Sequence, residues 1–190
     1  RDRLRSRGLG DVYKRQMQEF IRLFPDTCLL RTNRLGHFSA SAWVINPEAT
    51  KVLLNFHNIY KNWGWLGGHA DGEDDLLGVA LREVEEESGL TRLHAVSPSP
   101  ISLEILPVAY HNKNGRFVCS HTHLNLTYLV TALEEEPLRI KPDENSGLMW
   151  VELDKAPLLT NEECMKPIYE KLNQAVTVSY THLRAHETGA

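Results

Sequence analysis

The segment between Gly67 and Leu90 constrains the fold more than any other part of the chain. It predicts an amphipathic helix over about residues 74–88, directly after a Gly-Gly turn. Gly89 follows the last helical turn, where glycine commonly ends a helix because it tolerates a left-handed backbone. One side of the helix carries apolar residues at helical spacing, namely Leu77, Ala80, Leu81 and Val84. This side must be buried against a sheet or other helices.

Three glutamates occupy a second side of the same helix. Glu83, Glu86 and Glu87 are spaced at i, i+3 and i+4, so they lie close together on the helix surface. Like charges at this spacing repel, and folding alone gains nothing from them. A divalent cation reverses the balance, because hard ions such as Mg²⁺ bind several carboxylate oxygens. The pattern therefore predicts one helix with a core side and a metal side.

The same segment resembles the signature of the Nudix hydrolases. That signature has a glycine, five residues, a glutamate, seven residues, and then Arg-Glu-apolar-x-Glu-Glu-x-Gly-apolar. Gly68 opens the pattern here, and the residues from Arg82 to Leu90 are in register. Asp74 stands where the signature has its first glutamate, with Glu73 just before it, so either a shorter carboxylate serves or the loop shifts by one residue. The resemblance implies an α/β fold, an α/β/α sandwich with a mixed, mainly antiparallel sheet between helices.

The resemblance also implies a reaction and its residues. Nudix hydrolases cleave a nucleoside diphosphate linked to another group, with Mg²⁺ or in some cases Mn²⁺ as cofactor. Glu86, Glu87 and the backbone carbonyl of Gly67 match the family's metal ligands. Glu83 is expected to bind metal or to act as general base, which both require an ionised carboxylate. Arg82 is expected to orient Glu86, and the alternative for it is an ordinary surface ion pair.

Two further polar groups each have two interpretations. Glu144 lies in an acidic loop and is either a fourth carboxylate of the metal site or a solvated loop residue. His121 and His123 share a strand face with Asn125 because side chains alternate along a strand. This polar face either lines the substrate cleft or is half exposed. The two histidines alone do not predict a zinc site, because zinc needs further ligands.

The rest of the chain predicts one domain of alternating strands and helices. A hairpin turn is expected at residues 112–115, and strands 37–46 and 51–57 are expected to form a hairpin. The expected strands cover residues 37–46, 51–57, 62–66, 101–112, 116–132 and 148–153, and the expected helices cover residues 18–24, 74–88 and 162–175.

Both ends of the chain resemble translated sequencing-adaptor DNA. One DNA string encodes residues 6–16, and its reverse complement encodes residues 178–187. We therefore expect residues 1–16 and 178–190 to be non-native tails and residues 17–177 to form the Nudix hydrolase domain. A native terminus is expected to be missing from such a fragment.

Composition limits the partners and the compartment. The tails hold seven of the 21 basic and three of the 25 acidic residues, which leaves 14 basic against 22 acidic side chains. Such an acidic domain is not expected to bind nucleic acid, and no segment is apolar enough to span a membrane. Three scattered cysteines predict no disulfide framework and favour the cytoplasm. The expected partner is a small diphosphate substrate, and a homodimer is possible.

Two other functions fit the same pattern. A ligand-binding regulatory module could keep the fold without catalysis, but the three glutamates of the helix are retained and favour an enzyme. An isomerase of isopentenyl diphosphate would share the need for metal and diphosphate. Nothing in the signature favours that isomerase over a hydrolase.

Overall fold

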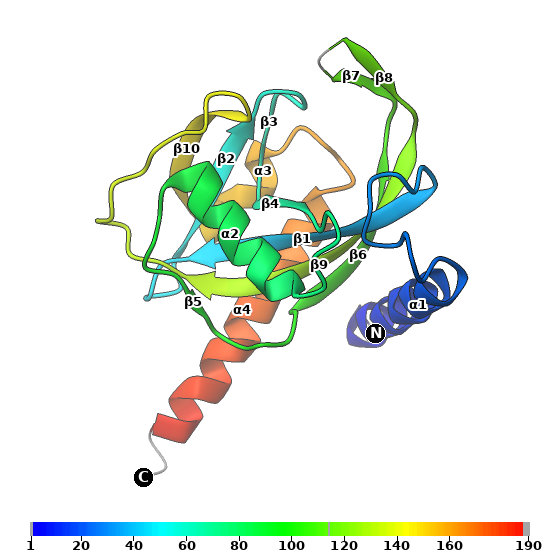
Figure 1. The fold of residues 1–190 in the computed structure, drawn as a ribbon. Coiled ribbons are helices and arrows are strands. Elements are labelled where there is room, and N and C mark those ends of the chain that lie inside the picture. Colours follow the sequence, from blue (N-terminus) through cyan, green and yellow to red (C-terminus); the bar gives the residue numbers. More distant parts are fainter. Residues whose placement is uncertain (1, 114, 188–190) are drawn as a thin grey trace.

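The computed structural model describes residues 2–113 and 115–187 as a mixed sheet with helices on both faces (Figure 1). Within these residues, eight strands form one sheet and two form a separate ribbon, β7 (His111–Lys113) with β8 (Arg116–Val118). The sheet contains β1 (Gly36–Ile45), β2 (Lys51–His57), β3 (Asn62–Gly64), β4 (Leu66–His69), β5 (His94–Ala95), β6 (Ser102–Val108), β9 (His121–Thr131) and β10 (Asn145–Glu152). The helices are α1 (Asp2–Leu23), α2 (Leu76–Ser88), α3 (Ala156–Leu159) and α4 (Lys166–Glu187).

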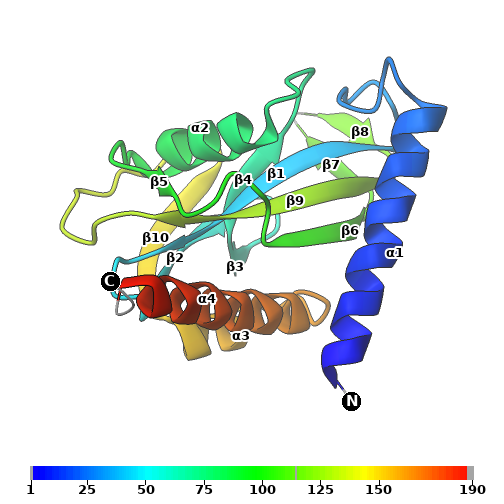
Figure 2. The same ribbon diagram turned by 90° about the horizontal axis from the view of Figure 1, so that it is seen from below.

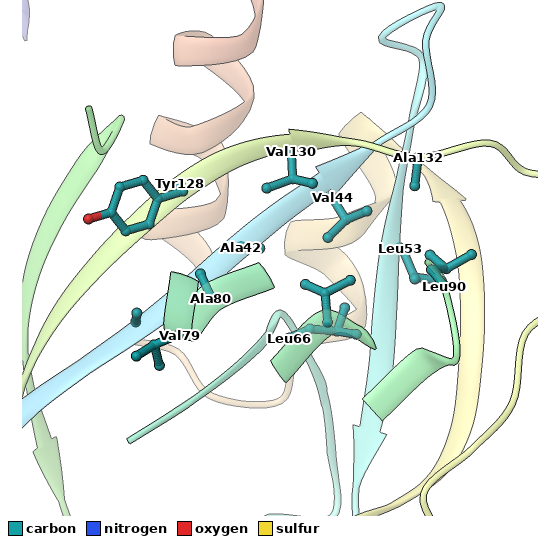
Figure 3. Packing of buried hydrophobic residues seen from close by; sticks show 12 residues of the cluster. Ala42, Val44, Leu53, Leu66, Val79, Ala80, Leu90, Tyr128, Val130 and Ala132 are labelled. Atoms are coloured by element: carbon teal, nitrogen blue, oxygen red, sulfur yellow. The ribbon is translucent and has the colours of Figure 1, made fainter. Parts of the chain in front are cut away.

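The layers confirm the expected α/β/α sandwich. Helix α2 covers one face of the sheet, while α3 and α4 cover the other, and α1 crosses the edge beside β6 (Figure 2). One apolar cluster lies between α2 and the sheet, and its side chains interdigitate in Figure 3. A second cluster lies between the sheet and α4 and includes Trp43, Tyr169 and Leu172, all essentially inaccessible to solvent. The two cores hold the sheet rigid between them.

The centre of the sheet is a parallel pair, β1 with β9. Ten consecutive residues of β1, from Gly36 to Ile45, pair with Thr122 to Thr131. Every residue of β1 is buried. The other neighbours in the sheet pair in antiparallel fashion, so the sheet is mixed and mainly antiparallel, as predicted.

Helix α2 agrees closely with the expected helix over residues 74–88. Asp75 caps its first turn, and the Asp75 carboxylate accepts a hydrogen bond from the Gly78 amide at 3.0 Å. Gly89 ends the helix with φ 76°, and its amide donates to the Glu85 carbonyl oxygen at 2.8 Å. The predicted C-cap is therefore confirmed.

The Gly-Gly turn before this helix was a wrong prediction. Gly67 and Gly68 lie in β4, which pairs antiparallel with β1 and places Gly67 opposite Ser41. A Cβ atom on Gly67 would overlap the carbonyl oxygen of Ala40. Glycine is needed here because two backbones approach closely, and the sequence gives no means to distinguish this use from a turn.

The two longest predicted strands are interrupted. Strands β6 and β9 stop pairing at Val108 and His121, and the chain then turns outward into the ribbon of β7 and β8 (Figure 1). Tyr110 and Phe117 are exposed there and contact each other, with ring centroids 5.9 Å apart. The strand-like alternation of the sequence continues through the bend, so it could not reveal that the chain changes direction there. Asn114, in the predicted turn, lies outside the described residues.

The remaining differences concern hairpin pairing and helix length. Strands β1 and β2 are paired only at Ile45 and Val52, because β4 takes the next part of β1. Helix α1 begins long before the expected residue 18, and α4 begins at Lys166 instead of residue 162 and continues past residue 175. Both helices run into the adaptor-like segments, of which residues 1 and 188–190 lie outside the described residues. Among the described residues, no helix has both the length and the apolar character that a bilayer crossing requires.

Candidate active site

Three carboxylates from two distant segments meet beside the C-terminal half of α2. Glu83 and Glu87 lie on α2, and Glu144 lies in the loop before β10. One oxygen from each of these three side chains lies within 4.8 Å of the others. The folded chain therefore brings Glu144 to the helix, in keeping with the first of the two interpretations of this residue.

Asn145 holds the acidic loop against the helix. Its amide nitrogen donates to the backbone carbonyl of Glu87 at 2.8 Å, and its amide oxygen accepts from the Lys141 backbone at 3.0 Å. The side chain is fully buried, so these two bonds have no competition from water. This role could not be predicted from the sequence, because asparagine in an acidic loop is typical of an ordinary turn residue.

Burial makes the charged form of two of these acids unfavourable. Glu87 is only 3% exposed, and burial raises its pKa to about 8 although its carboxylate accepts a hydrogen bond from the Gly67 amide at 3.1 Å. Burial, followed by the charges of Glu86 and Glu144, also raises the pKa of Glu83. A bound cation would offset both costs, since it favours ionised carboxylates.

Gly68 leaves the space that the Glu83 carboxylate occupies. A Cβ atom at residue 68 would overlap all three atoms of that carboxyl group. We expect Gly68→Ala to turn Glu83 away and to reduce hydrolysis at least tenfold, while the midpoint of urea unfolding changes little, because a flexible side chain can yield. Gly10→Ala, where an added Cβ has open space, is the control. Undiminished hydrolysis by Gly68→Ala would contradict this role.

Glu86 points to a different partner from the other two helix glutamates. Its carboxylate lies 3.0 Å from the Lys141 ammonium, which also lies 3.1 Å from Glu144. Arg82 lies 3.7 Å from Glu83 and 3.9 Å from Glu86, and about half of its side chain is exposed. Arg82 thus lies beside both glutamates, but at these distances it forms only a loose ion pair.

Lys141 was missed by the sequence analysis. Burial alone would lower its pKa, but hydrogen bonds to Glu86 and Glu144 outweigh burial and hold the pKa above its usual value. An ammonium group therefore neutralises part of the acidic site. It is separated from Glu86 by 55 positions in the chain, so no local pattern could indicate the contact.

Removal of this ammonium group should strengthen cation binding. We expect Lys141→Met to bind Mn²⁺ several-fold more tightly than the parent protein, because a competing positive charge is lost from Glu86 and Glu144. Calorimetric titration of the two proteins measures the difference. Lys155→Met is the matched control, since Lys155 forms an exposed ion pair with Glu152 at 2.7 Å. Equal or weaker Mn²⁺ binding by Lys141→Met would refute the competition.

A cleft of about 400 Å³ adjoins the carboxylates, a size typical of small-molecule sites. Gly67, Gly68 and Glu87 line it near the acids. Asn125 and His123 of β9 also line it, so the polar face of this strand is directed at a cavity. Aromatic side chains complete other parts of the wall, namely Tyr60, Trp65 and Tyr169.

The donor set suits a hard divalent cation. Carboxylate oxygens are the ligands that Mg²⁺ and Mn²⁺ prefer, and Glu83, Glu87 and Glu144 supply them from one small region. Glu86 is near but is paired with Lys141. Gly67 donates its amide to Glu87 and lines the cleft, while a role for its carbonyl stays a prediction.

An α/β/α sandwich with an acidic helix beside a cleft of small-molecule size is the arrangement that the Nudix signature predicts. The family model described as NUDIX domain matches residues 36–172, more than half of the chain. The chain belongs to the Nudix family and is a Nudix hydrolase. No curated protein matches it.

Solved structures share this fold at low sequence identity. The MutT protein of Methanosarcina mazei Go1 has a TM-score of 0.58 at 17% identity, covering 75% of this chain and 96% of its own. The Ap4A hydrolase of C. elegans has a TM-score of 0.56 at 18% identity, covering 74% and 97%. The dihydroneopterin triphosphate pyrophosphohydrolase of E. coli has a TM-score of 0.51 at 16% identity, covering 70% and 92%.

Proposed function

We propose that this enzyme hydrolyses the diphosphate bond of a nucleoside diphosphate derivative, or of a related small substrate, with Mg²⁺ as cofactor and Mn²⁺ as a substitute. The observation that carries the proposal is the meeting of Glu83, Glu87 and Glu144 beside a cleft of about 400 Å³. Three acids in one place are poor partners for an anionic substrate on their own. A divalent cation bound between them would cancel most of their negative charge and offer its free coordination positions to phosphate oxygens.

The chemistry divides between the ion and the side chains. A bound Mg²⁺ would neutralise phosphate oxygens and lower the pKa of water. Glu87 and Glu144 would hold it, with Glu86 joining them when Lys141 moves aside. Glu83 is the candidate general base, because its carboxylate lies beside Glu87 and Glu144, close to water on an ion that those two would hold. Arg82 would add a positive charge beside Glu83 and Glu86, and it would orient them only if it moved closer than the 3.7 Å and 3.9 Å seen here.

We also propose that the enzyme works in a reducing compartment such as the cytoplasm. Its three cysteines, Cys28, Cys119 and Cys164, are all free thiols. Two of them are exposed, and exposed free thiols persist where thiols are kept reduced. The acidic surface charge argues against nucleic acid as the substrate.

A substrate panel tests the proposed reaction. The full chain is incubated with ADP-ribose, an oxidised nucleoside triphosphate, Ap4A and dihydroneopterin triphosphate, and products are separated by chromatography. The last two compounds are included because structures of the same fold carry their names. We expect at least one substrate to be cleaved with Mg²⁺ or Mn²⁺ and none to be cleaved in EDTA. Cleavage that is equal in EDTA would overturn the metal dependence.

A further inference from the structure

Four histidines gather at the wall between the cleft and a second cavity. The second cavity has a volume of about 580 Å³, and His37, His69, His121 and His123 all line it. His37 lies on β1 and is the direct register partner of His123 on the parallel strand β9. One ring nitrogen from each of His37, His121 and His123 lies within 4.8 Å of the others. The parallel pairing thus adds a third imidazole to the two that share a face of β9.

One ring nitrogen of His37 is buried beside the other histidines. The Nε2 atom of His37 is inaccessible and has no hydrogen-bond partner among the described residues, and the whole residue is only 3% exposed. Leaving a buried polar atom unpaired destabilises the folded state, because the atom loses its hydrogen bonds to water. Buried polar atoms without partners are rare, and an ion at the site is one of the recognised explanations.

The other two rings face each other through nitrogen atoms. His121 Nε2 lies 3.1 Å from His123 Nε2. His121 Nδ1 lies 2.8 Å from the Cys119 carbonyl oxygen, to which it can only donate, so a neutral His121 presents a lone pair at Nε2. Zinc–nitrogen bonds of 2.0–2.1 Å in a tetrahedral site place two ligand nitrogens about 3.3 Å apart. The observed separation fits two ligands of one ion.

The backbone contacts also match those of metal-binding histidines. Such histidines usually donate their second ring nitrogen to a carbonyl or carboxylate, which fixes the ring and its tautomer. His121 has this contact with Cys119, and His37 Nδ1 has a longer one, 3.4 Å, with the Asn33 carbonyl oxygen. In both rings Nδ1 contacts the backbone, which leaves Nε2 as the nitrogen available to an ion.

We propose that His37, His121 and His123 form a binding site for a Zn²⁺-class transition-metal ion, with a fourth position open to the second cavity. Three histidines plus one water or anion are a known zinc ligand set. Arg31, Lys113 and Arg116 also line this cavity, so an anionic group is a suitable fourth ligand. This site is separate from the carboxylate site, because imidazoles select zinc, copper or nickel, whereas carboxylates select magnesium.

Cobalt spectroscopy of the full chain tests the site. The protein is purified without a histidine tag, stripped with chelator and titrated with Co²⁺ in excess Mg²⁺, which occupies the carboxylates. We expect one equivalent of Co²⁺ to bind with the intense visible absorption of tetrahedral coordination, and Zn²⁺ to abolish that absorption. Only weak absorption typical of octahedral Co²⁺, or no saturable binding, would overturn the proposal.

Matched variants locate the ion. His121→Gln and His123→Gln should each weaken Co²⁺ binding at least tenfold. His94→Gln, which changes an exposed histidine on β5, should leave it unchanged. Glu87→Gln should also retain the tetrahedral spectrum, so failure of the zinc proposal can be told apart from failure of the proposed hydrolysis. Circular dichroism confirms that each variant is folded, and unchanged Co²⁺ affinity in both histidine variants would refute the assignment.

Discussion

Glu87→Gln is expected to lower kcat/KM for the cleaved substrate at least about a hundredfold, the scale at which a lost metal ligand affects hydrolysis. The amide of glutamine can still accept the hydrogen bond from Gly67, so the helix and β4 should keep their arrangement. What is lost is the negative charge next to Glu83 and Glu144. Steady-state kinetics at saturating Mg²⁺ measures the effect.

Glu85→Gln is the control for this experiment. Glu85 lies on the same helix but is exposed, and it lies outside the group of carboxylates that meets Glu144. The control should retain nearly full activity. If Glu87→Gln were as active as Glu85→Gln, Glu87 could not be a metal ligand.

Glu87→Gln, although it should lower activity, should raise the stability of the protein at high pH. The pKa of Glu87 is raised from 4.5 to about 8 in the folded protein, so the folded state prefers the protonated carboxyl. The contribution of the Glu87 carboxyl to the free energy of unfolding is fully present below pH 4.5. It is lost as the pH rises through 8, and the loss is at most a few kcal/mol. In EDTA at pH 9, Glu87→Gln should therefore need more urea to unfold than the parent protein.

Mg²⁺ should reverse the order of stability of the parent protein and Glu87→Gln. With Mg²⁺ the parent protein gains stability by mass action, and the variant, which has lost a ligand, gains less. Urea titrations at pH 5 and pH 9, with EDTA or Mg²⁺, separate the four states. If the unfolding free energies of the two proteins changed with pH in the same way in EDTA, the Glu87 carboxyl would not be the source of the destabilisation at high pH.

Trp43→Ala is expected to have the largest effect on stability, about 3–5 kcal/mol of unfolding free energy. Trp43 is completely buried between β1 and α4, and its ring centroid lies 5.0 Å from that of Tyr169. Its indole nitrogen donates to the Asn173 side chain at 3.3 Å. Alanine would leave a cavity and a hydrogen-bond acceptor without its donor.

Urea unfolding at a fixed pH measures this loss. Phe117→Ala is the control, because Phe117 is an aromatic residue that is 69% exposed, and its replacement should change the unfolding free energy by no more than about 0.5 kcal/mol. A loss below about 1 kcal/mol for Trp43→Ala would mean that the core beneath α4 collapses to fill the space. Tyr169 also lines the cleft, so substrate affinity should weaken as well.

The features that the sequence predicted depend on neighbours along the chain. The helix period, the Gly89 cap and the placing of Glu83 and Glu87 on one side of α2 all follow from spacings of a few residues. The α/β/α layers followed from the family signature. The features that were missed depend on contacts between distant segments.

Two residues illustrate the limit. Asn145 binds the end of α2 from 58 positions away, and nothing beside it in the sequence reveals that contact. His37 joins His121 and His123 only because β1 and β9 run parallel in one register. A register between distant strands is set by the packing of both faces, which the single sequence does not disclose.

The parallel pairing of β1 and β9 has a consequence for synthesis. Ser39 and Asn125 are neighbours in the sheet, yet 86 positions separate them in the chain. The ribosome must therefore release most of the domain before its central strand gains this partner, and non-local pairing of this kind slows folding. During that interval an apolar strand edge stays open, and a nascent chain truncated before β9 is expected to aggregate or to engage chaperones.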